Sequence, residues 1–148
     1  MYWSLSRLGV CHCSSQIPWE LVGVKEWLVA SLGASALLVF VLSASTMAQP
    51  WAVIAGNTLS ALIGIAVAFV VQESLLAMPI AASLAILGMF VMRCLHPPAA
   101  AVALIVVLGH VTHFRYAFFP VLIDSALLVL VAGIYSNFNG KQYPKRPN

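Results

Sequence analysis

The sequence predicts an all-α fold, a polytopic bundle of transmembrane helices with about five apolar segments. Hydrophobic residues make up 62% of the 148 residues, charged residues make up only 7%, and the mean hydropathy is +1.00. Such a chain has too little polar surface to cover a water-soluble globule. Apolar windows near the length of about 20 residues that crosses a bilayer recur from Trp27 almost to the end of the chain. Their hydrophobicity is continuous rather than alternating, which favours helices over a membrane β-barrel.

The first apolar segment spans residues 27–45 and begins with Trp27, an aromatic residue typical of the membrane interface. Residues 1–26 are polar and without a clear period, so we expect an irregular N-terminal segment there. They lack the long apolar core and small-residue cleavage pattern of a secretory signal.

The second apolar segment spans residues 51–71 and follows a short connection that ends in Pro50. Small and polar residues recur on roughly one face of this segment, which predicts close packing against another helix. These residues are Gly56, Asn57, Ser60 and Gly64.

Three more apolar segments complete the transmembrane domain. The third spans residues 75–95, with Pro79 expected in its first turn, where proline costs no internal hydrogen bond. The fourth, residues 97–110, is short for a full crossing. The fifth spans residues 118–138 and carries Asp124 early in its length.

The chain is expected to form one transmembrane domain, residues 27–138, followed by a basic tail or linker, residues 139–148. The formal net charge is +3, and Lys141, Lys145 and Arg146 lie in the tail. Such cations are enriched at the cytoplasmic membrane edge. The chain has no basic patch of the kind that binds nucleic acid.

A weak internal similarity indicates an incomplete 3+3 inverted repeat. Residues 33–39 resemble residues 98–104, and residues 57–62 resemble residues 124–128 in the same order. The leading helix of the first unit would precede Trp27, where the sequence shows no apolar segment. Inverted repeats place a transported solute between the two units. Chance similarity between apolar segments of low complexity is the open alternative.

Residues 93–101 contain the strongest candidate for a functional site. Arg93 and His96 lie between two strongly apolar segments, and Pro97 with Pro98 predicts a helix start. Ionisable side chains at bilayer depth are rare and usually line a pathway. The free amides and positive dipole end of such a helix start attract anions. The alternative is an ordinary helix boundary with both ionisable side chains at the lipid headgroups.

We expect a second helix start near Gly33, with the Ser31 and Ser35 hydroxyls beside it, so that two helix starts face one ligand. Asn57 and Asp124 would line the path, although Asp124 also lies within reach of an ion pair with Arg115 or His113. The candidate binding or pathway residues are Ser31, Gly33, Ser35, Asn57, Arg93, His96, Pro97, Pro98 and Asp124.

The chain is not expected to hold a metal or cofactor, or to be an enzyme. Its three cysteines cannot pair completely, and adjacent Cys11, His12 and Cys13 do not have tetrahedral zinc spacing. His110 and His113 have no nearby carboxylate or cysteine partner. We find no nucleophile elbow, phosphate-binding loop or HExxH pattern.

The run His-Pro-Pro-Ala-Ala-Ala at residues 96–101 resembles the motif of the HPP family of integral membrane proteins. Ser-Leu-Gly-Ala-Ser-Ala at residues 31–36 and Ala-Gln-Pro at residues 48–50 are similar to further motifs of that family, and the resemblance covers about residues 28–143. Members of the family normally have another apolar helix before the first of these runs. Asn57 stands where many members have His, and Asp124 stands where members with C-terminal CBS regulatory domains often have Asn.

The resemblance implies a transporter or channel-like protein for a small anion, with nitrite as the substrate known for plastid and cyanobacterial members. We expect a bacterial inner membrane, with a plastid membrane as the second choice. The expected partners are the lipid bilayer, a small anion, and either further copies of the chain or a separate regulatory chain. The alternative function is a non-transporting membrane module, either a truncated domain or a sensor or assembly subunit.

Overall fold

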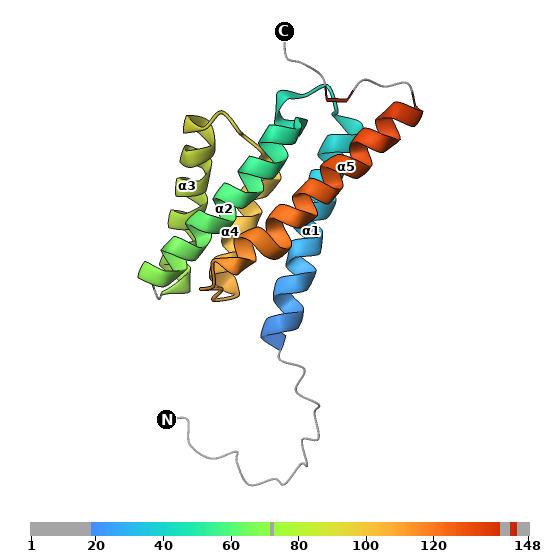
Figure 1. Cartoon of the computed structure of the whole chain (residues 1–148). Coiled ribbons are helices and arrows are strands. Elements are labelled where there is room, and N and C mark those ends of the chain that lie inside the picture. The colour runs from blue at the N-terminus through green and yellow to red at the C-terminus, as the bar shows by residue number, and fades with distance from the viewer. Residues whose placement is uncertain (1–18, 72, 140–142, 145–148) are drawn as a thin grey trace, which may run out of the picture.

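The computed structural model describes residues 19–71, 73–139 and 143–144, with side chains from residue 29 onward. All regular elements within these residues are helical, which confirms the predicted all-α bundle. Five helices run alternately up and down the long axis of the bundle (Figure 1). They are α1 (Trp19–Val41), α2 (Pro50–Val70), α3 (Ser74–Val91), α4 (Pro97–Leu108) and α5 (Ile123–Phe138).

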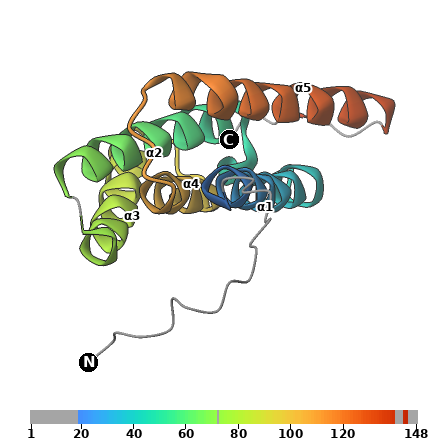
Figure 2. The same cartoon turned by 90° about the horizontal axis from the view of Figure 1, so that it is seen from below.

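The helices form two layers (Figure 2). Helices α2 and α5 make one layer, and α3, α4 and α1 make the other. Helix α4 is antiparallel to α1, and α5 is antiparallel to α2. This arrangement is the one that the predicted inverted repeat would give, since equivalent helices of such a repeat run in opposite directions.

Helix α1 begins at Trp19 and ends at Val41, whereas the sequence predicted residues 27–45. Residues 19–26, expected to be irregular, therefore form the first turns of this helix. The prediction was wrong because it followed the apolar window, and helical geometry continues through polar residues outside such a window.

Helix α2 matches its predicted segment closely and confirms the predicted close packing. A Cβ atom on Gly64 would lie 2.9 Å from the carbonyl oxygen of Ala103 in α4. A Cβ atom on Gly56 would lie 3.0 Å from both the carbonyl oxygen of Cys94 and Cβ of His96. The two glycines thus allow α2 to approach α4 and the loop that carries His96.

Helix α3 ends at Val91 rather than at residue 95 because a left-handed residue closes it. Arg93 has φ 51°, and the amide of Cys94 donates to the carbonyl of Met89 at 3.0 Å, as in a Schellman cap. Pro79 lies one turn inside α3 rather than in its first turn, so it removes one backbone hydrogen bond on the exposed side of the helix.

The last two predicted segments differ in length and regularity. Helix α4 has 12 residues, so it is about 18 Å long and shorter than the hydrocarbon core, as predicted. Helix α5 follows a wide helical turn, η2 (Ala117–Leu122), in which Phe119 is extended with φ −135° and ψ 108°. The fifth segment is therefore interrupted near its start.

Three of the described helical spans are long and apolar enough to cross a membrane: Pro50–Val70, Ser74–Val91 and Ala117–Phe138. Two shorter apolar spans, Val29–Val41 and Pro97–Leu108, accompany them. Large apolar side chains remain exposed on the outside of the bundle, as lipid contact requires.

Candidate functional site

His96 lies at the start of α4 with its side chain completely buried. Pro97 disfavours a helical backbone in the residue before it, and His96 is accordingly extended, with φ −134° and ψ 98°. Its Nε2 lies 2.9 Å from Oγ of Ser35 in α1, and its Nδ1 lies 2.9 Å from the carbonyl oxygen of Met47. The ring therefore joins α1, the α1–α2 connection and α4.

These two contacts determine which nitrogen of His96 carries the proton. A carbonyl oxygen only accepts, so Nδ1 donates to Met47, and Nε2 then accepts from the Ser35 hydroxyl. Burial lowers the pKa of His96, and the hydrogen bond to the Met47 carbonyl opposes this effect. The ring is thus a neutral connector between three parts of the chain.

The α1–α2 connection holds the Met47 carbonyl in place. The amide of Met47 donates to Ser45 Oγ at 3.3 Å, and Nε2 of Gln49 donates to the Ser45 carbonyl at 3.1 Å. The hydroxyl of Tyr143 donates to the Ala48 carbonyl at 2.9 Å. Burial raises the pKa of Tyr143 to about 12, so its hydroxyl remains a donor at neutral pH.

A second buried polar contact joins α2 to α5. Nδ2 of Asn57 donates to Oγ of Ser125 at 3.0 Å, and the Ser125 hydroxyl donates to the Val121 carbonyl at 2.8 Å. Since the Ser125 proton is already used, the Asn57 amide must turn its NH₂ group toward Ser125. The Asn57 oxygen, Oδ1, is buried and has no hydrogen-bond partner. Leaving such an acceptor unpaired costs about 1–3 kcal/mol.

A third polar position lies where the bundle turns into α5. The Tyr116 hydroxyl is buried and also has no hydrogen-bond partner. Burial and, to a smaller extent, the negative charge of Asp124 raise the pKa of Tyr116 to about 12. Asp124 itself is half-buried in the first turn of α5. No ion pair joins it to Arg115, His113 or another described residue.

The structure places the predicted residues of α1 differently from the sequence. Ser31, Gly33 and Ser35 lie inside one continuous helix, so the predicted helix start near Gly33 is wrong. A run of small residues is also found at helix starts, but here it lies within the continuous helix Trp19–Val41. Ser31 and Ser35 are buried, whereas Gly33 is exposed with no atom within 4 Å of the position of a Cβ. Gly33 therefore faces away from the polar positions.

The start of α4 offers fewer amides than predicted. Pro97 and Pro98 have no N–H group, and the amide of Ala99 donates to the His96 carbonyl at 2.9 Å. Ala99 is also fully buried. Attraction of an anion to this helix start therefore depends on the dipole of the short helix more than on free amides.

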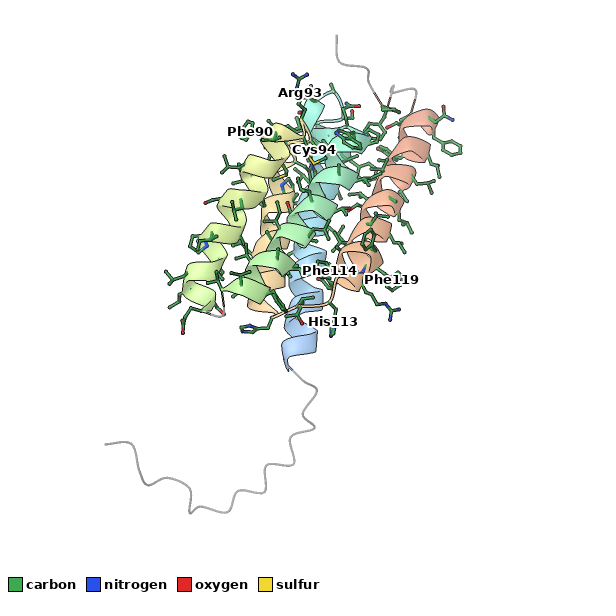
Figure 3. All side chains as sticks on the ribbon, turned by 60° about the vertical axis from the view of Figure 1, so that its left-hand side comes forward. Phe90, Arg93, Cys94, His113, Phe114 and Phe119 are labelled. Carbon is green, nitrogen blue, oxygen red and sulfur yellow. The ribbon has the colours of Figure 1, made fainter. Side chains whose placement is uncertain are left out.

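Arg93 is exposed and lies at one end of the bundle with Cys94 and Phe90, opposite His113, Phe114 and Phe119 (Figure 3). His96, three residues after Arg93, belongs to the same end. His96 therefore lies toward the Arg93 end, and Tyr116, three residues after His113, lies toward the opposite end.

Sequence reasoning missed three of these groups. Met47 contributes a backbone carbonyl, for which the sequence has no signal. Ser125 directly follows Asp124, which was predicted. Its hydrogen bond with Asn57 depends on how α2 and α5 pack, so the sequence gives no signal for it. Tyr116 lies in the polar and aromatic turn before the fifth segment, where its burial was not expected.

No group of three His, Cys, Asp or Glu side chains able to hold a metal occurs among the described residues. Cys11, His12 and Cys13 lie outside the residues that the structure describes, as do Lys141, Lys145 and Arg146. Cys94 is a free, buried thiol, which is the ordinary role of a cysteine in an apolar protein interior.

Comparison with known proteins gives a family match over almost the whole chain. The family described as the transmembrane region of HPP proteins matches residues 4–144. A transmembrane protein from Dictyostelium discoideum is 36% identical over 126 residues, covering 80% of this chain and 40% of the relative. A second transmembrane protein of that organism is 35% identical over 125 residues, covering 79% of this chain and 44% of the relative. The chain thus spans less than half of the length of these relatives. No solved structure gives a significant match.

Proposed function

The chain belongs to the HPP family of transmembrane proteins, and from that premise we propose that it forms the membrane part of a transporter for a small anion. Nitrite is the first substrate to test, since the family resemblance implies it. The observation that carries the proposal is the unpaired Asn57 oxygen inside a series of buried polar side chains. Polar groups in a membrane interior are costly, and they usually mark a path for a solute.

Each polar position has a proposed role along this path. Arg93 attracts the anion to its end of the bundle, and Pro97 with Pro98 directs the dipole of α4 toward that end. His96 and Ser35 form the first constriction, because their hydrogen bond must open before either group contacts a solute. Ser31 lines the path below Ser35, one helical turn away.

Asn57 is the central contact of the proposed path. Its NH₂ group donates to Ser125 at rest, and a solute that displaces this bond would receive a donor suited to an oxyanion. Its free oxygen accepts a hydrogen bond from water or from a protonated solute. Asp124, one residue before Ser125 in the first turn of α5, lines the proposed path next to this contact.

The location and assembly of the protein are also proposals. Integral membrane placement follows from the family and from the apolar helices. Within that, a bacterial inner membrane remains our prediction, while the two relatives described above come from a eukaryote. Further copies of the chain or a separate regulatory chain are the partners that we propose to seek.

A second function is favoured by a different observation. Both ring nitrogens of His96 are already bonded within the protein, as in a purely structural connector. In a non-transporting module that assembles with other membrane segments, such hydrogen bonds would serve only to hold the helices together. The two functions differ in whether the polar interior passes a solute.

Uptake into proteoliposomes tests the proposed function. Nitrite, nitrate and chloride should be offered to the wild-type chain, to Asn57→Ala and to the matched control Thr58→Ala. The Thr58 hydroxyl bonds only to the Ile54 carbonyl of its own helix at 2.7 Å, so this control leaves the path intact. We expect uptake of at least one anion by the wild type and the control, and loss of uptake in Asn57→Ala. Equal uptake by all three proteins, or none by the wild type, would favour the non-transporting module.

A further inference from the structure

Asp124 is unusual because it is an acidic side chain inside a membrane-length apolar span, Ala117–Phe138. Among the residues with described side chains, the other acidic residue, Glu73, is exposed in the connection before α3. Asp124 is half-buried and makes no ion pair with any described cation. An ionised carboxylate away from water is costly unless it is paired or takes up a proton.

Two polar atoms without hydrogen-bond partners are linked to Asp124, one through its chain neighbour Ser125 and the other through its charge. Ser125, its neighbour in the chain, accepts a hydrogen bond from Asn57, whose Oδ1 is buried and unpaired. The Tyr116 hydroxyl is buried and unpaired, and it responds to the charge of Asp124. Both atoms can bond to a proton carrier or to a solute beside it.

In this part of the bundle, Asp124 is the described side chain with a carboxyl group, which can take up and release a proton. The described polar side chains that α1 and α2 bury are Ser31, Ser35, Asn57 and Ser60, and none of them titrates at physiological pH. Tyr116 stays protonated, because burial and the Asp124 charge raise its pKa to about 12. Arg115 and His113, on the preceding connection, are exposed.

We propose that Asp124 carries the proton that accompanies the anion, so that the chain is a proton–anion symporter; this rests on the proposed function. One proton from the entry side binds the Asp124 carboxylate and makes a neutral carboxyl group. One monovalent anion then passes Asn57 without meeting a second negative charge. The proton and the anion leave together on the other side, and the ionised carboxylate is restored.

This scheme explains why a carboxylate belongs in an anion path. An ionised Asp124 repels the anion through a medium of low dielectric constant, whereas the neutral form does not. The anion therefore passes only when a proton is present. The net charge moved in each cycle is zero.

Proton movement during uptake tests the coupling. Proteoliposomes that contain a trapped fluorescent pH indicator should be given an inward nitrite gradient, with protein-free liposomes as the background for permeation of nitrous acid. We expect the wild-type chain to acidify the interior above this background, and an acidic exterior to drive nitrite accumulation. Asp124→Asn should lose both signals, Asp124→Glu should retain them, and the exposed-carboxylate control Glu73→Gln should match the wild type.

A measurement on the wild type alone keeps the test decisive if Asp124→Asn does not fold. An imposed membrane potential should leave uptake unchanged, because the coupled cycle moves no net charge. Uptake that follows the potential, or uptake without acidification, would overturn proton coupling while leaving anion transport in place. Acidification by a folded Asp124→Asn would overturn the assignment of the proton to Asp124. Absence of uptake by the wild type under every gradient would instead overturn the proposed function itself.

Discussion

At the residue scale, His96 shows how a buried histidine can be both polar and structurally fixed. Its two nitrogens bond to Ser35 and to the Met47 carbonyl, so its neutral form is matched to its surroundings. Protonation would put two donors against each other at Nε2 and Ser35 Oγ unless the serine hydroxyl turned. The histidine therefore connects the stability of the bundle to pH.

We predict that the protein loses stability as the pH falls below neutrality. Burial holds the pKa of His96 below its ordinary value of 6.5 in the folded state, so the unfolded state binds more protons in this range. The stabilisation is fully present above pH 6.5 and is lost as the pH falls toward the lower folded pKa. Thermal unfolding in detergent between pH 8 and pH 5 measures this, at roughly unit intervals.

The controls for this prediction separate His96 from the exposed histidines. His96→Asn keeps a donor for Met47 without a titrating ring, and its unfolding temperature should depend less on pH than that of the wild type. His113→Gln should keep the wild-type dependence, because His113 is exposed. The same pH dependence in His96→Asn and in the wild type would contradict the assignment.

At the element scale, small residues determine how closely the helices pack. Ala77, Ala81 and Ala85 lie one turn apart on α3 and are fully buried in a cluster with Val67 and Ala103. Helices in a membrane associate through this kind of close contact, since lipid and side chains are equally apolar. The glycines of the bundle differ in the same way: Gly64 lies on a face packed against α4, whereas Gly33 lies on an open face.

We predict opposite effects for two glycine-to-alanine substitutions. Gly64→Ala should destabilise the bundle by about 1–3 kcal/mol, because the new methyl group would meet the Ala103 carbonyl at 2.9 Å. Gly33→Ala should stabilise α1 by about 0.5–1 kcal/mol, because alanine is the better helix former and the position is open. Thermal unfolding of both purified variants beside the wild type measures the difference. Similar changes in unfolding temperature for the two variants would contradict the close contact between α2 and α4.

At the scale of the whole molecule, five alternating helices place the start of α1 and the end of α5 at opposite ends of the bundle (Figure 1). The hydrogen bonds Ser35–His96 and Asn57–Ser125 join α1 with α4 and α2 with α5, the same pairs that the inverted repeat treats as equivalent. The repeat remains a prediction that this arrangement supports.

We predict a defined sidedness for single-cysteine variants in a background without the three native cysteines. Arg93→Cys and Asn139→Cys should react with a membrane-impermeant maleimide from one side of sealed vesicles. Glu73→Cys and His113→Cys should react only from the other side, because these exposed residues lie at the opposite end. Labelling of Arg93→Cys and His113→Cys from the same side would contradict the alternating arrangement.

The sequence by itself determined the fold class, the family and most helix positions, because these depend on local composition and on motif order. Apolar windows of membrane length located α2 and the short α4, and the His-Pro-Pro run identified where α4 begins. Local rules failed where a helix continues beyond its apolar part, as at Trp19, or closes on a left-handed residue, as at Arg93.

Only the tertiary structure decided which candidate residues meet. In the folded chain, Ser35 bonds to His96 and Asn57 bonds to Ser125, whereas Gly33 lies on an exposed face. The Met47 carbonyl and the Tyr116 hydroxyl, which the sequence did not indicate, also belong to the buried polar positions. These outcomes depend on helix rotation and on contacts between residues as far as 68 positions apart. Hydropathy in a membrane helix is nearly uniform around its axis, so a sequence does not show which face a polar residue occupies until the helices pack.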